Sequence, residues 1–73
     1  PANTGWQRDL SVSHDKLGDV AVSAGDLAGA RAAYQASLDI AVRLAAADPA
    51  NMQWQRDLAY VRKRIDDLPG APA

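Results

Sequence analysis

The stretch WQRDL stands at residues 6–10 of this chain and again at residues 54–58. The match extends further, because PANTGWQRDL at residues 1–10 and PANMQWQRDL at residues 49–58 agree at eight of ten positions. Internal repeats with a period of about 20 to 50 residues are typical of proteins that stack one supersecondary unit along the chain. The 48-residue spacing therefore predicts one full unit at residues 1–48, followed by a partial second unit.

The composition predicts a small soluble protein that is held together by side-chain packing. The chain has 73 residues and no cysteine, which excludes disulfides and thiolate metal sites. A net charge of -1 argues against binding to nucleic acid or to an anionic membrane. No apolar run approaches the ~20 residues of a membrane span, and the amino terminus lacks the pattern of a signal peptide. We therefore expect a cytoplasmic protein.

The domain organisation follows from the repeat. We expect a single domain at residues 1–68, in which residues 49–68 form a partial repeat or a capping helix. The Pro- and Gly-containing end at residues 69–73 predicts a disordered tail. Because the chain begins at Pro1 and not at methionine, we expect it to be part of a longer protein.

Apolar residues recur every three or four positions, as on one face of a helix. In the first helix, His14 shares this stripe with Trp6, Leu10, Leu17, Val20, Ala21 and Ala24. A second helix is predicted from about residue 27 to residue 47, with one face formed by Leu27, Ala30, Tyr34, Leu38, Ala41, Leu44 and Ala45. A third is predicted from about residue 52 to residue 67, with apolar positions at Trp54, Leu58, Val61, Ile65 and Leu68. The predicted fold class is all-α, an antiparallel helix-turn-helix repeat with a third, capping helix.

Turn and cap residues separate these helices. Gly25 can adopt the left-handed conformation that ends a helix, and Asp26 can cap the helix that follows. Asn3 and Asn51 are placed as amino-terminal caps of the first and third helices. Pro49 interrupts the chain after the second helix, because proline lacks the backbone donor and restricts the residue before it.

The two turns set the register of the antiparallel helices. Trp6 is expected level with about Leu44, and Trp54 level with about Ala45. Both tryptophans should then close over the far end of the second helix, one from each side.

Residues across the first two helices resemble a known repeat family. The pattern His14-x2-Leu17-Gly18-x2-Ala21, followed by Gly25-Asp26 and Ala30-x3-Tyr34, resembles the tetratricopeptide repeat, whose signature is W-x2-L-G-x2-Y, then A-x3-F, then P. Departures occur at His14, Ala21, Ser37 and Asp66, and the period is 48 residues rather than about 34. The additional residues lengthen the start of the first helix and the end of the second by about two turns each. The chain therefore looks like the long-helix variety of bacterial tetratricopeptide repeat.

The resemblance implies a fragment of a right-handed αα solenoid, which acts as a protein-protein interaction module or scaffold without catalysis. In that family the first helix of each unit lines a concave groove that binds a peptide or a neighbouring domain. By motif position, the candidate groove residues are Val12, Asp15, Lys16, Asp19, Tyr60, Lys63, Arg64 and Asp67. The basic clamp of some members is only partly matched because of Asp15, but Lys63 and Arg64 could hold one carboxylate of an acidic peptide.

The sequence offers little chemistry for catalysis or for cofactors. His14 is the only histidine, so we interpret it as a helix-interface residue rather than a metal ligand or a general base. Asp15 and Asp19 lie four positions apart without a partner acid or nucleophile, which is typical of a solvated helix face. The basic cluster VRKR at residues 61–64 is short and is soon followed by two aspartates. We therefore expect no enzyme activity, no cofactor, no metal, and no nucleic-acid or membrane partner.

A structural role is the alternative function. Copies of the chain would stack or exchange helices into homo-oligomers, because a solenoid unit buries its apolar face only against neighbours. Polar residues on the outer side of the third helix, as a capping helix requires, are Arg62, Arg64 and Asp66. Apolar surface that could meet another copy remains on the first helix at Val12, Val20 and Val22.

Overall fold

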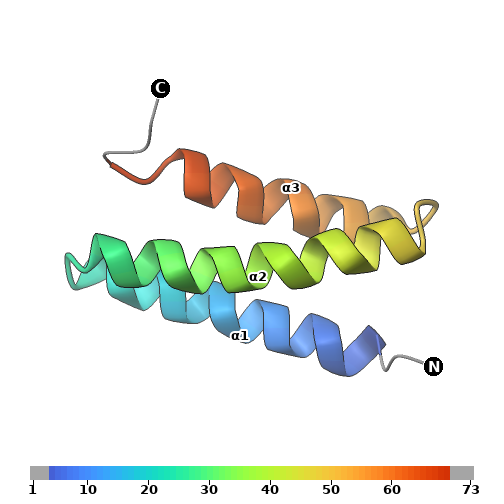
Figure 1. Ribbon diagram of the computed structural model, residues 1–73, viewed down its shortest axis with the longest axis horizontal. Helices are drawn as coiled ribbons and strands as arrows, with labels where there is room; N and C mark the ends of the chain where they lie inside the picture. The colour runs from blue at the N-terminus through green and yellow to red at the C-terminus, as the bar shows by residue number, and fades with distance from the viewer. Residues whose placement is uncertain (1–3, 70–73) are drawn as a thin grey trace.

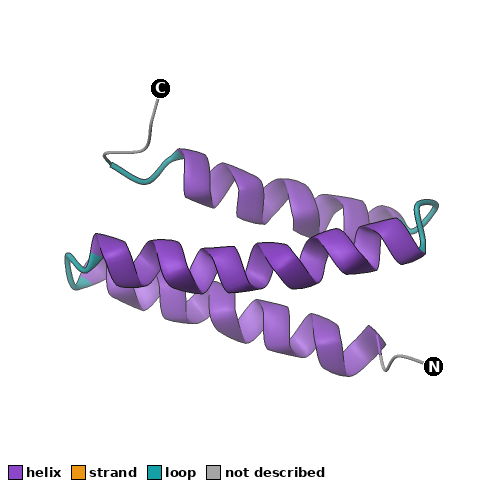
Figure 2. Cartoon of the chain, viewed as in Figure 1, coloured by secondary structure: helices purple, strands orange, loops and turns teal. Residues whose placement is uncertain are grey.

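Between residues 4 and 69 the chain forms three α-helices, with the second packed against both of the others. The computed structural model describes residues 4–69, with α1 at Thr4–Ser23, α2 at Leu27–Ala47 and α3 at Met52–Asp66. Successive helices run antiparallel, and short loops join them (Figures 1 and 2). The described residues contain no strand, so the predicted all-α class is confirmed. The second helix has its predicted bounds, and the third ends one residue earlier than predicted.

Capping residues hold the loops between the helices, as the sequence predicts. Gly25 has a φ of 79°, in the left-handed region. The Asp26 side chain accepts a hydrogen bond from the backbone N–H of Gly29 at 2.8 Å, at the start of α2. The Asn51 side chain likewise accepts from a backbone N–H in the first turn of α3, at 3.1 Å. These three predictions are confirmed, while the predicted cap at Asn3 lies outside the described residues.

The core is built around α2. The buried residues of α2 are Ala30, Tyr34, Ser37, Ile40, Ala41, Leu44 and Ala45. From α3, Val61 is fully buried, and Leu58 and Ile65 are partly buried against the same cluster. Leu68, just beyond α3, completes it with 5% of its surface exposed. The apolar positions predicted for the third helix therefore do pack inward, with Trp54 half-buried.

The predicted face of α2 differs from the observed one at three positions. Leu27 lies at the edge and is exposed, whereas Ser37 and Ile40 are buried without having been predicted. Ser37 fits in the core because its hydroxyl forms a hydrogen bond with the Ser11 hydroxyl of α1 at 2.9 Å. Since α2 is covered by two helices, its buried face is wider than a single stripe of three-and-four spacing.

The face that α1 presents to α2 includes Ala21 of the apolar stripe predicted from the sequence but not the larger side chains of that stripe. The buried residues of α1 are Ser11 and Gly18, whereas Leu17 and Val20 are 59% and 67% exposed. A Cβ built at Gly18 would lie 2.6 Å from Cδ1 of Tyr34, so only glycine lets this ring lie against the α1 backbone. Small residues thus define the α1–α2 contact, and the larger apolar side chains point away from it.

The predicted closure of both tryptophans over the far end of α2 is wrong for Trp6. Trp6 is 62% exposed, although Leu44 near that end of α2 is buried. The reason is the rotation of α1 about its axis. When Ser11 and Gly18 face α2, the stripe that begins at Trp6 faces outward.

Candidate functional site

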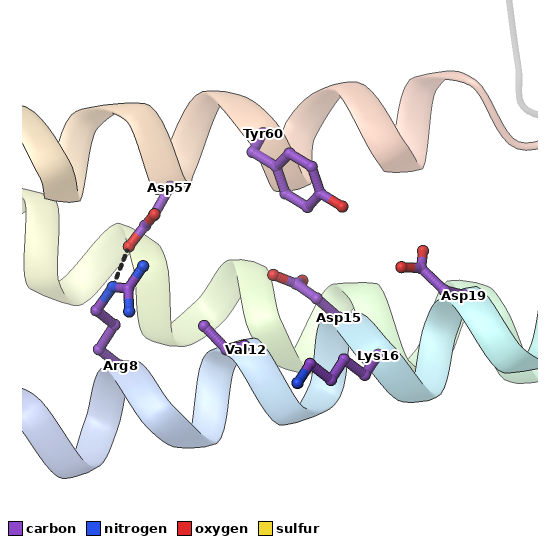
Figure 3. A pocket seen from close by; sticks show the side chains of 7 residues that line it. All are labelled: Arg8, Val12, Asp15, Lys16, Asp19, Asp57 and Tyr60. Carbon is purple, nitrogen blue, oxygen red and sulfur yellow. Dashed lines mark hydrogen bonds and ion pairs between the residues drawn. The ribbon is translucent and has the colours of Figure 1, made fainter.

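A groove lies between α1 and α3, and side chains of these two helices line it. Its cavity has a volume of about 330 Å³ and is lined by Arg8, Val12, Asp15, Lys16, Asp19, Asp57 and Tyr60 (Figure 3). Five of the eight residues predicted for a peptide groove are in this lining: Val12, Asp15, Lys16, Asp19 and Tyr60. The structure therefore brings most of the predicted residues together, although their role as a binding site stays a prediction.

An ion pair between the two copies of WQRDL spans one end of the groove. Arg8 Nε of α1 donates to Asp57 Oδ2 of α3 at 3.0 Å (Figure 3). Arg8 belongs to the first copy of the motif and Asp57 to the second. Both residues line the cavity, and neither was predicted as a site residue. The repeat itself was the signal that could have found them, since WQRDL places an arginine and an aspartate side by side on each of two helices.

A second polar cluster joins all three helices near the other end of the groove. The Tyr34 hydroxyl of α2 donates to Asp19 of α1, and Arg64 Nη2 of α3 donates to the same carboxylate oxygen at 3.1 Å. Burial, together with the hydrogen bond to Asp19 and its charge, raises the pKa of Tyr34 to about 12. The Arg64 guanidinium also lies over the Tyr60 ring, 5.3 Å from its centroid.

The charge of Arg64 is secured by this cluster. Burial lowers the pKa of Arg64, but the Asp19 carboxylate and the neighbouring tyrosines raise it by more, so its pKa lies above the usual value. Arg64 is therefore held in an ion pair with Asp19, although 42% of its side chain is exposed.

Asp15 lies between the two ion pairs and forms no ion pair with any of the described residues. Its Oδ1 is buried and has no hydrogen-bond partner among the described residues. Burial raises the pKa of the Asp15 carboxyl, and the charges of Asp19 and Asp57 raise it further, while the Ser37 hydroxyl and the charge of Arg64 lower it. A buried acceptor without a donor is costly, so Asp15 is the group of the groove that would gain most from a donor.

The remaining three predicted residues, Lys63, Arg64 and Asp67, lie outside the cavity lining. Lys63 and Asp67 form an exposed ion pair with each other, with Nζ of Lys63 3.4 Å from Oδ2 of Asp67. Lys63 and Arg64, the predicted carboxylate clamp, each have an aspartate partner in this structure, and the clamp stays a prediction. An acidic peptide would have to compete with both.

The described residues contain neither a membrane-spanning helix nor a cluster of metal ligands. Between residues 4 and 69, no helix combines the length and the apolar character needed to cross a membrane. In the same part of the chain, no three His, Cys, Asp or Glu side chains gather where they could hold a metal ion. His14 is half-buried on α1 and does not line the cavity. The groove between α1 and α3 is therefore the candidate site.

No family model, no curated protein and no solved structure matches this chain. The groove must therefore be interpreted from its own residues. The resemblance to tetratricopeptide repeats stays a prediction that rests on the residues quoted above.

Proposed function

We propose that this chain is a non-catalytic interaction module of the tetratricopeptide type, which binds a peptide or a neighbouring domain in the groove between α1 and α3. The finer fold assignment is part of the proposal: one full helix pair followed by the first helix of the next unit, in a right-handed solenoid. The observation that supports it best is the cavity between two repeat-related helices, in which Val12 of the first unit and its counterpart Tyr60 of the second line the same space. Concave sites with a few convergent polar groups are the usual places for ligands.

The chemistry of the ligand follows from which groups of the groove are already paired. Arg8 is paired with Asp57, and Asp19 with Arg64. Asp15 is left as an acceptor, and Val12 and Tyr60 are left as apolar surface. We propose a peptide that places an apolar side chain against Val12 and Tyr60 and a hydrogen-bond donor, such as a lysine or arginine side chain, at Asp15.

The test is selection of binders from a displayed random peptide library on the full chain. Peptides that bind the wild type should lose roughly tenfold or more in affinity with Val12→Lys, because the change removes apolar surface and adds a bulky cation to the groove. Val42→Lys is the matched control, since Val42 is 42% exposed on α2 and does not line the cavity. Circular dichroism verifies that both variants are folded. Equal affinity for the two variants, or no enriched peptide, would contradict the proposal.

Binding of the selected peptides to Asp15→Asn tests whether the groove prefers basic peptides. Among the selected peptides, those with a lysine or arginine should bind Asp15→Asn more weakly than wild type, and acidic peptides should not. If acidic peptides are enriched instead, and Lys63→Gln with Arg64→Gln weakens them, the acidic-peptide hypothesis replaces the one favoured here.

Self-assembly is the second candidate function, and the observation that favours it is the exposed apolar stripe of α1. Leu17 and Val20 are 59% and 67% exposed, which is unusual for large apolar residues aligned on one helix. Sedimentation equilibrium over a wide concentration range tests it. Association that grows with concentration and is lost in Leu17→Lys supports self-assembly, while a monomer throughout supports the peptide-binding module.

A further inference from the structure

We infer that the exposed stripe of α1, formed by Leu10, Leu17 and Val20, is a docking face for a helix equivalent to α2 in another unit of the 48-residue repeat. This inference concerns a surface other than the groove and does not depend on peptide binding. It commits to one occupant, a further unit joined ahead of α1, and it is carried by what the equivalent face of α3 does within this structure.

The residues of the stripe have counterparts in α3 that are covered by α2. A shift of 48 residues aligns Leu10 with Leu58, Leu17 with Ile65, and Val20 with Leu68. Leu58 and Ile65 pack against the core cluster, and Leu68 is 5% exposed, compared with 67% for Val20. The same type of side chain at the same position of the repeat is therefore buried in the second unit and exposed in the first.

The surface that covers α3 has a defined chemistry. In the core cluster, Val61 and Leu68 are joined by Ala30, Tyr34 and Ala41 of α2, and Leu38 packs against them, so this surface of α2 consists of apolar side chains around one aromatic ring. At its end, Gln55 Nε2 donates to the Ala45 carbonyl at 3.3 Å. Gln7 is the counterpart of Gln55 in the first unit, and it could make the same bond to an α2-type helix.

Charges beside the stripe point to a further repeat unit rather than to an unrelated helix. Within this chain, α1 and α3 are joined by Arg8 with Asp57 and by Asp19 with Arg64. The same shift aligns Asp57 with Asp9 and Arg64 with Lys16, which keeps the sign of charge at both positions. Both Asp9 and Lys16 are exposed. A unit ahead of α1 would therefore offer its own Arg8 to Asp9 and its own Asp19 to Lys16.

A separate second copy cannot offer this surface of α2 to the stripe, because its own α3 already covers that surface. The surface is open only in a unit that is joined directly ahead of α1, where α1 takes the place that α3 has in this chain. The sequence permits such a junction: joining Asp48 to Pro1 gives DPAN, the same four residues as at Asp48 to Asn51. The occupant can thus be supplied by placing residues 1–48 ahead of the full chain.

The experiment compares the full chain with this fusion, in which residues 1–48 precede the full chain. Residues of the full-chain portion of the fusion keep their numbers. The fusion should unfold in one cooperative transition, with a midpoint roughly 5 °C or more above that of the full chain, because the stripe becomes buried. Leu17→Lys and Val20→Lys, made in the full-chain portion, should lower the midpoint of the fusion by a similar amount. In the full chain alone they should change the midpoint by no more than roughly 3 °C, since both positions are exposed there.

Val42→Lys is the matched control, because it places the same side chain on an exposed position of α2 and should act equally in both proteins. Two separate transitions, or equal effects of the stripe variants in both proteins, would overturn the inference. Sedimentation of the full chain tests the remaining alternative, in which a second copy covers the stripe. A dimer that Leu17→Lys abolishes would support that alternative and would also overturn the inference.

Discussion

At the position of Gly18, the backbone of α1 lies against the ring of Tyr34. Any side chain there would meet the ring, since even a Cβ would lie 2.7 Å from Cζ of Tyr34. This one residue explains why α1 turns its larger apolar side chains away from α2. The rotation of the helix, and with it the exposure of the stripe, depends on a single missing methyl group.

Gly18→Ala should destabilise the protein by about 1 to 3 kcal/mol, because the ring or the helix must move to admit the methyl group. This loss should exceed the gain in helix propensity of up to about 1 kcal/mol. Gly5→Ala is the matched control, because Gly5 is exposed in the first turn of α1 and should gain stability or remain unchanged. Urea unfolding monitored by circular dichroism measures both. A stabilising effect at Gly18 would show that the contact is looser than described.

Tyr34 makes the stability of the fold sensitive to alkaline pH. The pKa of Tyr34 is raised from 10.0 to about 12 in the folded protein, so the folded state holds this proton more tightly than the unfolded chain. The resulting stabilisation is fully present below pH 10 and is lost as the pH rises through about 12. Wild type should therefore lose stability more steeply across this range than Tyr34→Phe.

Urea unfolding at a series of pH values measures this difference. Near neutral pH, Tyr34→Phe should also cost about 1 to 2 kcal/mol for the lost hydrogen bond to Asp19. Tyr60→Phe is the control, because Tyr60 is half-exposed and makes no hydrogen bond to Asp19. Identical alkaline profiles for wild type and Tyr34→Phe would exclude the coupling.

At the scale of the helices, the sequence was a good guide to where each element begins and ends. Local signals decide these points: Gly25 and Asp26 at one turn, and Asn51 at the other. It was a poor guide to the rotation of α1, because the three-and-four spacing of apolar residues assumes that the largest side chains face the core. Here Ser11 and Gly18 face α2, and their small size could be interpreted only with the Tyr34 ring in place.

The candidate site, too, could be predicted from the sequence only in part. Five of the residues that the motif register predicted do line one cavity, because helix periodicity fixes which positions share a face. The pairing of the charges could not be predicted in this way. Arg64 lies within reach of Asp19 only because α3 and α1 rest on one helix, and that distance is a property of packing.

Leu44 tests the packing near the end of α2. Leu44 is 4% exposed, so Leu44→Ala should cost roughly 2 to 5 kcal/mol of unfolding free energy through the cavity it leaves. Leu17→Ala removes the same atoms from a side chain that is 59% exposed, and it should change the stability by less than about 1 kcal/mol. Thermal or urea unfolding compares them. Similar losses for the two variants would mean that α1 is rotated differently about its axis.

At the scale of the whole molecule, α1 and α3 are joined across the groove mainly by polar side chains. The Arg8 and Asp57 side chains are 33% and 29% exposed, so solvent and salt weaken their attraction. A double-mutant cycle with Arg8→Met and Asp57→Asn should give a coupling of about 0.2 to 1 kcal/mol, smaller in high salt. A coupling well above this range would show that the pair holds the two helices together rather than only aligning them.

The main helix packing joins only elements that follow one another in the chain, α1 with α2 and α2 with α3. This arrangement has a kinetic consequence, because folds made mostly of local contacts assemble quickly, often in microseconds to milliseconds. Since α2 belongs to both helix pairs, either hairpin can form first and serve as the template for the remaining helix. A substitution that weakens the first hairpin would therefore redirect the order of assembly instead of blocking it, and α2 would be the last helix to lose its structure during unfolding.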